Sequence, residues 1–420
     1  MKRAAIISLT IPEIPGKSGG EIRDIYLFEY FGRNYKTDYY SIHNFFGEGE
    51  VNKEFSELFE HIYYPALINE EYHDQIDEAV MLTFFDKVRY KLSLSGLYVP
   101  GQCIPAEILG FRNEFNRYIK KFFERIAAKE KYDYVFISPQ VNPAIVEDII
   151  VPENTKIIWA TYDVEKIRHS RLLETKNGVL KKQFYKFEIA AACKYEQKAV
   201  AKSDGIIAVS ELDREAFIKL YHLRPSRVLS IENGVDVEYF HAMEDVQNHN
   251  IVFVGNMGYA PNDQATRYFV KEIFPEILKK VPDAHFYAVG ANASDDLKLL
   301  EANNITVTGR VEDVRDYLKI ACVVCVPLLA GSGTKYKVLE AMACEKAVIT
   351  TSFGSEGLDV SHADNIMIAD DGKGIIQYVT ELLDQDEKRK QIGKNARKFI
   401  LQYHAWNAIL PKVIDWAERL

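Results

Sequence analysis

The residue types best suited to chemistry gather in one segment, where a loop of small residues leads into a helix. The segment reads Ala330-Gly-Ser-Gly-Thr-Lys335-Tyr-Lys337-Val-Leu-Glu340, and Pro327 ends the apolar strand before it. A helix N-terminus presents unpaired N–H groups and a partial positive charge, which suit a phosphate. Lys335 and Lys337 add cations at this end although the helix dipole opposes them, so the sequence favours an anionic partner. Glu340, three residues after Lys337, lies on the same helix face.

The same segment limits the kind of site. We expect Thr334 to cap a helix over Lys335–Ala343. A solvated amphipathic helix with a Lys–Glu pair stays open as the alternative interpretation. The G-x-x-x-x-G-K-[ST] sequence of P-loop ATPases is absent, which argues against that class of protein.

Two further glycine-bearing loops follow expected strands. Gly16-Lys-Ser-Gly-Gly20 lies between the first strand and the first helix, and Gly255-Asn256-Met257-Gly258 follows the strand Ile251–Val254. Ligands of doubly wound sheets bind beyond the carboxyl ends of the strands, so both loops are candidate phosphate contacts, with an ordinary turn as the alternative for each. The second loop lacks the G-x-G-x-x-G sequence of dinucleotide-binding proteins, which argues against a nucleotide cofactor of that type.

The elements that must position these loops alternate along almost the whole chain. Short apolar runs rich in β-branched and aromatic residues recur, each followed by a longer segment of helical period. The expected strands are Ala4–Leu9, Asp38–Ile42, Tyr134–Ser138, Lys156–Tyr162, Gly205–Ser210, Arg227–Glu232, Ile251–Val254, His285–Val289, Ile305–Thr308, Val323–Pro327, Ala347–Thr351 and Asn365–Ile368. The expected helices are Gly20–Phe31, Asp74–Tyr90, Glu114–Lys131, Leu180–Lys202, Glu211–Tyr221, Asp263–Lys280, Ser294–Asn303, Asp313–Lys319, Lys335–Ala343, Gly374–Gln385, Glu387–Gln402 and the amphipathic Ala408–Leu420. This alternation predicts an α/β fold with two doubly wound, Rossmann-like domains, whose parallel sheets are covered by helices on both sides.

The boundary between the two domains is expected near Asn233-Gly-Val-Asp236. An Asn-Gly turn ends the strand Arg227–Glu232, and the polar stretch Asp245–Asn250 precedes a fresh strand. We therefore expect an N-terminal domain over residues 1–235 and a C-terminal domain over residues 236–402. A terminal helix over residues 403–420 is expected to pack back on the N-terminal domain.

Composition narrows the function classes. The chain has 420 residues, of which 47% are apolar and 27% charged, and a formal net charge of −9. These values exclude a wholly disordered chain and argue against non-specific binding of nucleic acid. No apolar run approaches the ~20 residues needed to span a bilayer, and the start of the chain is typical of a first strand rather than of a signal peptide. Five cysteines without framework spacing fit a reducing cytoplasm.

No pattern in the sequence indicates a metal or a resident cofactor. The one literal D-x-D sequence, Asp384-Gln-Asp386, ends a late polar helix and is expected to be surface charge. Cys322 and Cys325 lie in an apolar strand whose alternation sends their sulfurs to opposite faces, so we expect buried structural thiols rather than a zinc or redox site.

Four short motifs occur in an order that resembles one known family. They are Asn233-Gly-Val-Asp236 with Phe240, Phe253-Val-Gly255 with Pro261-Asn262, Gly309-Arg310-Val-x-Asp313, and Lys337-Val-Leu-Glu-Ala-Met-Ala343. Together they resemble the retaining, nucleotide-sugar-dependent glycosyltransferases of the GT-B fold, called group 1 or family 4. The first half adds weaker matches at Gly19-Gly20, Asp163-Val-Glu165-x-x-Arg168 and Ser210-Glu-x-Asp213. The resemblance implies an acceptor-side and a donor-binding Rossmann-like domain that face each other across a cleft.

The resemblance also implies a role for each matching residue. Glu340 looks like the carboxylate that accepts hydrogen bonds from the ribose hydroxyls of the donor nucleotide, and Lys337 adds a donor-side cation. The donor-binding residues implied further are Gly331, Ser332, Gly333, Thr334 and Lys335 around the diphosphate and the sugar, Gly255 and Asn256 at the phosphates, Arg310 and Val311 at the base, and Gly19 and Gly20 in the facing wall. The implied catalytic residues are Lys335, Asp163 and Arg310, without a metal and without a cofactor other than the nucleotide-diphosphate sugar as co-substrate.

The chain departs from the family pattern at two positions near the sugar. Ser332 stands where many relatives have a Glu that contacts the transferred sugar. Tyr162 stands where many relatives have a His, and His169 is close to it in sequence. The identity of the donor sugar therefore does not follow from the resemblance.

A third departure concerns the positive charge beside the diphosphate. Many relatives carry an Arg and a Lys after Phe253-Val-Gly, and here Asn256 and Gly258 replace them. Breaking a glycosyl–phosphate bond develops negative charge on the diphosphate, which cations and helix dipoles stabilise. We expect Lys335 or Arg310 to supply the missing charge, so that no metal is needed.

The resulting prediction is the retaining transfer of a hexose-type sugar to a hydroxyl of a glycan or lipid-linked acceptor, in bacterial surface glycan biosynthesis and in the cytoplasm. The basic amphipathic segment Arg112–Lys131 would suit a peripheral contact with the inner membrane surface, with a helix that covers the first sheet as the alternative. A second basic run, Lys176, Lys181, Lys182 and Lys186, is equally ambiguous. A nucleotide-sugar epimerase or phosphorylase of the same fold, and a catalytically silent nucleotide-sugar-binding protein, stay open as alternative functions.

Overall fold

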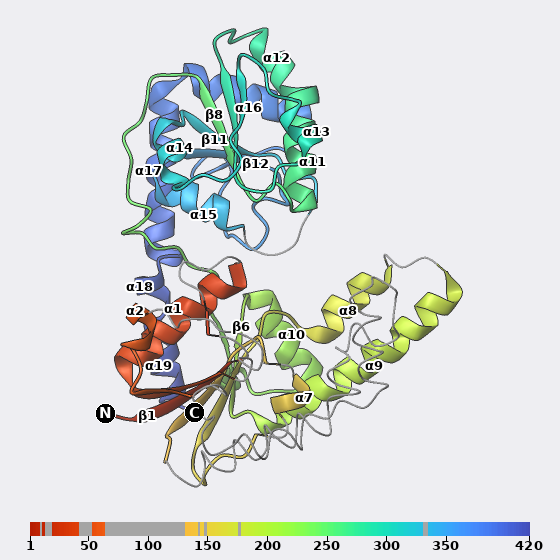
Figure 1. The fold of residues 1–420 in the computed structure, drawn as a ribbon, viewed down its shortest axis with the longest axis vertical. Coiled ribbons are helices and arrows are strands. Elements are labelled where there is room, and N and C mark those ends of the chain that lie inside the picture. Colours follow the sequence, from red (N-terminus) through yellow and green to blue (C-terminus); the bar gives the residue numbers. More distant parts are fainter. Residues whose placement is uncertain are drawn as a thin grey trace. The chain divides into compact units, whose positions relative to one another are not determined.

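The computed structural model describes residues 1–8, 11–12, 19–41, 53–63, 131–141, 143–146, 149–174, 178–330 and 335–420. They form two compact units, one of Met1–Glu232 with Leu410–Leu420 and one of Asn233–Ile409 (Figure 1). The expected helices Asp74–Tyr90 and Glu114–Lys131, and with them the basic segment Arg112–Lys131, lie outside the described residues except for Lys131 itself.

The first unit is built on a seven-stranded sheet in the order β3-β2-β1-β4-β5-β6-β7, in which every adjacent pair is parallel. The four residues of β4 are buried on both faces, as a sheet between two layers of helices requires. The strands are β1 (Arg3–Ser8), β2 (Lys36–Ser41), β3 (His61–Tyr63), β4 (Tyr134–Ile137), β5 (Lys156–Ala160), β6 (Gly205–Ala208) and β7 (Val228–Ser230). The helices are α1 (Gly19–Asn34), α2 (Lys53–Ser56), α7 (Pro143–Val146), α8 (Glu165–Glu174), α9 (Val179–Lys202), α10 (Glu211–Tyr221) and α19 (Pro411–Ala417).

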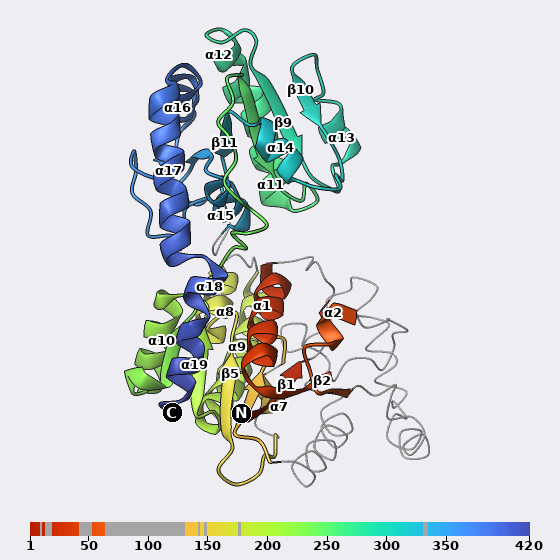
Figure 2. The same cartoon turned by 90° about the vertical axis from the view of Figure 1, so that its left-hand side faces the viewer.

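The second unit repeats this plan with a six-stranded parallel sheet in the order β10-β9-β8-β11-β12-β13. Helices α16 and α17 contact each other (Figure 2). Both helices also contact β12. The strands are β8 (Asn250–Val254), β9 (His285–Val289), β10 (Ile305–Val307), β11 (Val323–Val326), β12 (Ala347–Thr350) and β13 (Met367–Ile368). The helices are α11 (Ala260–Tyr268), α12 (Phe274–Leu278), α13 (Asp295–Lys298), α14 (Arg315–Ile320), α15 (Tyr336–Ala343), α16 (Gly372–Asp384), α17 (Asp386–Tyr403) and α18 (Trp406–Ile409).

The predicted α/β fold with two Rossmann-like parallel sheets is confirmed. Helix α10 and strand β9 have the predicted bounds. Ser210 caps α10, because its side chain accepts a hydrogen bond from the backbone N–H of Asp213 at 3.1 Å. The Ser210-Glu-x-Asp213 motif therefore has a local structural role at the start of this helix.

Some predicted helices are shorter or interrupted. The predicted helix Asp263–Lys280 is wrong as a single element, because a π-helical turn over Phe269–Ile273 separates α11 from α12. Pro275 lacks the N–H that would bond four residues back, and the N–H of Phe274 bonds five residues back to Phe269 instead. The predicted helix Ser294–Asn303 contracts to α13, and the helix predicted over Asp313–Lys319 begins only at Arg315.

The C-terminal segment belongs to the first unit from Leu410 onward. A Cβ on Gly205, at the start of β6, would stand 2.5 Å from the Trp416 ring, so only glycine lets this indole lie against the strand. Lys2 and Glu418 approach to 3.6 Å. The first unit ends at Glu232 and the second at Ile409, where the sequence suggested 235 and 402. Among the described residues, no helix combines the length and apolar character that crossing a bilayer needs.

Candidate functional site

The candidate site of the second unit lies at the carboxyl edge of its sheet. Strands β8, β9 and β11 are parallel, so the residues that follow them meet at one edge. Gly255 follows β8 and Gly290 follows β9, and the N–H of Gly255 donates to the carbonyl of Val289 at 2.9 Å. The chain after β11 leads into α15, which carries Lys337 and Glu340.

Two glycines let the backbone pack closely at this edge. Gly290 has φ +145°, and a Cβ there would stand 1.9 Å from the carbonyl oxygen of Gly255. A Cβ on Gly255 would stand 2.8 Å from Asn262 Nδ2 and 3.2 Å from Lys337 Cε. Gly255 therefore brings the loop after β8 against the side chain of Lys337. Sequence reasoning missed Gly290, although a glycine directly after an expected strand was the same signal that singled out Gly255.

The loop after Gly255 is held by side-chain amides. Asn256 Oδ1 accepts hydrogen bonds from the N–H of Gly258 at 3.0 Å and from Asn292 Nδ2 at 3.1 Å. Asn262 Nδ2 donates to the carbonyl of Asn256 at 2.8 Å. Asn262 is buried, and its Oδ1 has no hydrogen-bond partner within the described part of the chain. Asn256 thus shapes this loop, and Asn262 places an amide oxygen beside it.

Lys337 and Glu340 form a coupled pair of partly buried charges. Burial raises the pKa of Glu340 to about 7, against the opposing influence of Lys337. Burial lowers the pKa of Lys337 to about 8, and Glu340 raises it in turn. The Lys337 ammonium lies 5.9 Å from the centroid of the Phe253 ring. Two neighbouring titratable groups with pKa values moved toward neutrality are typical of a functional site.

Lys335 stands at the N-terminus of α15. The expected N-cap at Thr334 is wrong by one residue, because Lys335 occupies the N-cap position and the helix begins at Tyr336. A lysine side chain has no acceptor for the first N–H groups of the helix, and no side-chain hydrogen bond caps it. Burial lowers the pKa of Lys335, while Glu356 raises it. The loop residues Gly331, Ser332, Gly333 and Thr334 lie outside the described residues.

Arg310 and Val311 follow β10, at the far end of the same edge. Arg310 is exposed and Val311 is partly buried. Gly309 before them has φ +67°, which glycine adopts without strain. The two carboxylate oxygens of Asp313, in the same motif, share the N–H of Arg315 Nε, at 3.0 and 2.8 Å. The structure therefore gives Asp313 a local partner on its own segment.

In the first unit, Gly19 and Gly20 begin α1 at the carboxyl edge of the sheet. A Cβ on Gly20 would stand 2.9 Å from the ring of Tyr162, which follows β5. The Tyr162 hydroxyl donates to Asp24 Oδ2 at 2.7 Å. Gly20 therefore makes room for a tyrosine that is bonded to a carboxyl group on the second turn of α1.

The exposed Asp163 precedes α8, whose first turn forms a partly buried polar network. Glu165 Oε2 accepts from Arg168 at 2.6 Å and lies 2.9 Å from His169 Nε2. The N–H of Glu165 donates to Glu196 Oε1 on α9 at 2.7 Å. The Asp163-Val-Glu165-x-x-Arg168 motif thus fixes the start of α8. His169 takes part in this network through its Nε2 atom, which faces Glu165.

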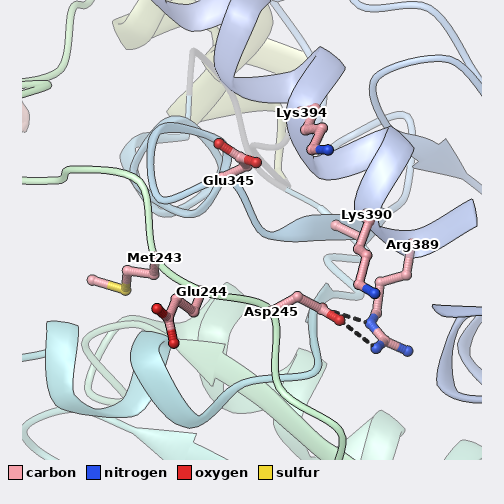
Figure 3. A pocket seen from close by; sticks show the side chains of 8 residues that line it. Met243, Glu244, Asp245, Glu345, Arg389, Lys390 and Lys394 are labelled. Carbon is pink, nitrogen blue, oxygen red and sulfur yellow. Dashed lines mark hydrogen bonds and ion pairs between the residues drawn. The ribbon is translucent and has the colours of Figure 1, made fainter. Parts of the chain in front are cut away.

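A cavity of about 390 Å³ opens at the opposite, amino edge of the second sheet. Figure 3 shows its lining side chains, among them Glu244, Asp245, Arg389, Lys390 and Lys394. The Arg389 guanidinium is buried and donates to Asp245 at 2.8 and 2.7 Å and to the carbonyl of Leu382 at 2.8 Å. Because these bonds use most of its donors, we interpret Arg389 as a structural residue.

The remaining motifs give no metal site. Asp386 of the Asp-Gln-Asp sequence lies 2.9 Å from Arg389 and accepts from Gln247 at 3.1 Å. Cys322 and Cys325 are buried free thiols, as predicted, and burial raises the pKa of both. Among the described residues, no group of three His, Cys, Asp or Glu side chains could hold a metal ion.

Residues 248–385 match the profile of the family Glycosyl transferases group 1. This part of the second unit carries Gly255, Lys337 and Glu340. The two parallel Rossmann-like sheets are those of the GT-B glycosyltransferases. This part of the second unit is therefore a glycosyltransferase domain of the group 1 type.

Three similar proteins extend this comparison. An uncharacterized 44.6 kDa protein in the cps region of Klebsiella pneumoniae is 27% identical over 290 residues, which cover 66% of this chain and 71% of that protein. A phosphatidyl-myo-inositol mannosyltransferase of Mycolicibacterium smegmatis is 23% identical over 232 residues, which cover 52% of this chain and 57% of the mannosyltransferase. The crystal structure of Anabaena HepE in complex with UDP and glucose has a TM-score of 0.61 and 14% identity, with 100% of both chains covered.

Proposed function

We propose that this chain transfers a hexose-type sugar from a nucleotide-diphosphate sugar to a hydroxyl acceptor, with retention of configuration and without a metal. The acceptor we propose is a growing glycan or a lipid-linked sugar of a bacterial surface polysaccharide, assembled on the cytoplasmic side of the inner membrane. The similarity to a protein of the Klebsiella pneumoniae cps region supports a role in the synthesis of a surface polysaccharide. The complex of HepE with UDP makes a uridine nucleotide the first donor to test.

The observation that carries the proposal is the convergence of Gly255, Lys337 and Glu340 at the carboxyl edge of the second sheet. The start of α15 and the Lys337 cation suit a diphosphate. Glu340, one turn further along, suits the hydroxyl groups of a ribose, since an ionised carboxylate only accepts hydrogen bonds. Cation and carboxylate in this order match the two ends of a nucleoside diphosphate.

The proposed mechanism follows from this charge distribution. When the glycosyl–phosphate bond breaks, negative charge grows on the leaving diphosphate. Lys335, Lys337 and the dipole of α15 are already oriented and partly desolvated, so they stabilise that charge with little reorganisation. Asp163 and Arg310, which are exposed and follow β5 and β10, remain proposed catalytic participants.

The experiment that tests the proposal measures release of nucleoside diphosphate from UDP-glucose, UDP-galactose, GDP-mannose and ADP-glucose. Methyl glycosides and octyl β-glucoside serve as acceptors, and NMR of the product gives the anomeric configuration. We expect acceptor-dependent release from one donor and a product that keeps the donor's configuration. Conversion of one nucleotide sugar into its epimer would support an epimerase instead. A strict requirement for inorganic phosphate would support a phosphorylase.

A matched pair of variants links the activity to the site. Glu340→Ala is expected to raise the KM for the donor and to lower kcat/KM at least tenfold, because the ribose contact is lost while the fold persists. Glu272→Gln, at an exposed carboxylate of the same unit, is expected to leave both values unchanged. An unchanged donor KM in Glu340→Ala would refute the role of this carboxylate.

A further inference from the structure

A side-chain amide with an unused acceptor lies beside Lys337 at the carboxyl edge of the second sheet. Asn262, on the first turn of α11, is 4% exposed. Its Oδ1 atom is buried and accepts no hydrogen bond from any residue that the structure describes. Burying an amide oxygen in this way is unfavourable, because the oxygen gives up its bonds to water and receives none in exchange. A donor that reaches this oxygen is therefore bound favourably.

The other polar atoms of Asn262 are all bonded, and they fix the direction of the amide. Asn262 Nδ2 donates to the backbone carbonyl of Asn256 at 2.8 Å. The N–H of Asn262 donates to the carbonyl of Tyr259 at 2.9 Å, and the Asn262 carbonyl accepts from Thr266 Oγ1 at 2.9 Å. The amide group therefore has one defined orientation, in which Oδ1 is the atom that still lacks a partner within the described parts of the chain.

Lys337 carries a donor on the same side of Gly255. A Cβ on Gly255 would stand 2.8 Å from Asn262 Nδ2, 3.0 Å from Asn262 Cγ and 3.2 Å from Lys337 Cε. The amide and the end of the lysine side chain therefore pass over the same bare Cα atom. Because Nζ is bonded to Cε, a change of the last side-chain torsion turns the ammonium group toward the amide or away from it. An ammonium group has three N–H donors, which suit an amide oxygen.

The charges around Lys337 are compatible with this partner. Burial lowers the pKa of Lys337, Glu340 raises it and Lys335 lowers it, and both of these charged neighbours lie on α15 itself. Asp263, the next residue of α11, is paired with Arg267, whose Nε donates to it at 2.7 Å. An amide oxygen favours the charged form of the lysine by hydrogen bonding, and it adds no net charge that would repel a diphosphate.

We propose that Asn262 is a positioning residue for Lys337 and that its amide oxygen holds the ammonium group toward the diphosphate of the bound nucleotide. One N–H of the ammonium group bonds to Asn262 Oδ1, and the other two are left for phosphate oxygens. Asn262 does not touch the nucleotide in this arrangement, because its Oδ1 is covered by protein. The inference rests on the proposed binding of a nucleoside diphosphate at this edge and names the residue that directs its cation.

The test is a double-mutant cycle between Asn262→Ala and Lys337→Met, with Kd values for UDP, GDP and ADP measured by calorimetry. Asn256→Ala is the matched loop variant, because it removes two hydrogen bonds that hold the same loop and leaves the amide of Asn262 in place. Asn303→Ala, at an exposed residue of the same unit, controls for the loss of an asparagine as such. A melting curve of each variant reports whether the fold persists.

Asn262→Ala is expected to weaken the nucleotide that wild-type protein binds best by about 3- to 10-fold, as the loss of one hydrogen bond implies. In the Lys337→Met background the same substitution is expected to change Kd by less than about twofold, because the ammonium group that it positions is gone. Asn256→Ala loosens the loop with or without Lys337, so its effect is expected to be equal in both backgrounds. Asn303→Ala leaves Kd unchanged.

A crystal structure of wild-type protein with the same nucleotide checks the inference without any substitution. We expect Asn262 Oδ1 and Lys337 Nζ to lie at about 2.7–3.2 Å, the usual distance of an N–H···O hydrogen bond. A separation too long for a hydrogen bond in that complex would overturn the inference, whatever the variants do.

The possible failures are distinguishable. A loss in Asn262→Ala that is equally large with and without Lys337 would assign Asn262 to the loop alone. That result overturns this inference and leaves the proposed function standing. Wild-type protein that binds none of the three nucleotides would overturn the proposed function together with this inference.

Discussion

Lys337 and Gly255 are in contact across the carboxyl edge of the second sheet, with Lys337 Cε 3.2 Å from the position that a Cβ on Gly255 would take. The contact joins the loop after β8 to the helix after β11. It places a lysine whose pKa is lowered beside backbone that carries no side chain. The lysine and this bare stretch of backbone therefore meet beside the start of α15.

Gly255→Ala tests this contact. The added methyl group would press on Asn262 Nδ2 at 2.8 Å and on Lys337 Cε, both at the ends of flexible side chains. We expect the fold to persist with a small fall in Tm, while the Kd for UDP or its best-binding counterpart rises roughly tenfold, which is about 1.4 kcal/mol. Calorimetry and a melting curve on the same sample measure both effects. An unchanged Kd would show that Lys337 does not contact the nucleotide.

The affinity for the nucleoside diphosphate is expected to depend on pH with a maximum between about 7 and 8. Below about 7 Glu340 becomes protonated and accepts fewer hydrogen bonds from the ribose. Above about 8 Lys337 loses the charge that attracts the diphosphate. Calorimetry from pH 5.5 to 9.5 measures this dependence. In Glu340→Gln we expect the affinity no longer to fall below about pH 7 but still to fall above about pH 8. A flat profile would contradict the assignment of both groups.

Much of this site could be predicted from the sequence, because its signals are local. An apolar run that ends in glycine marks the edge of a sheet, and Lys337 and Glu340 are one helical turn apart. The hydrogen bond between Tyr162 and Asp24 could not be predicted, because it joins residues 138 positions apart and depends on the strand order. The π-helical turn before Phe274 was missed for another reason, because hydrophobic periodicity does not register the missing N–H of Pro275.

Glu340→Gln is expected to stabilise the protein without ligand at neutral and alkaline pH. The pKa of Glu340 is raised in the folded state, so the folded protein binds this proton more tightly than the unfolded chain does. Stability is therefore lost as the pH rises from about 4.5 toward 7, by about 1–3 kcal/mol. Melting curves should show a Tm a few degrees above wild type at pH 8 and an equal Tm near pH 4. A lower Tm at pH 8 would mean that the Lys337–Glu340 attraction outweighs the burial of the carboxylate.

Arg389→Met separates structure from function in the second unit. The substitution leaves Asp245 and the carbonyl of Leu382 without their buried donor, and breaking such a pair costs about 3–5 kcal/mol. We expect a large fall in Tm and an unchanged Kd for the nucleotide in the folded fraction. Arg267→Met, which breaks the partly exposed pair with Asp263, is the control and should cost less than about 1 kcal/mol. A weakened Kd in Arg389→Met would mean that the cavity in Figure 3 takes part in binding.

The most direct measurement is a crystal structure of the protein with the nucleoside diphosphate that binds best. The account predicts the diphosphate between Gly255 and the N-terminus of α15, with Lys337 in contact and the ribose hydroxyls within hydrogen-bond distance of Glu340. A nucleotide seated instead in the cavity beside Arg389, or one that leaves Glu340 facing only solvent, would contradict it.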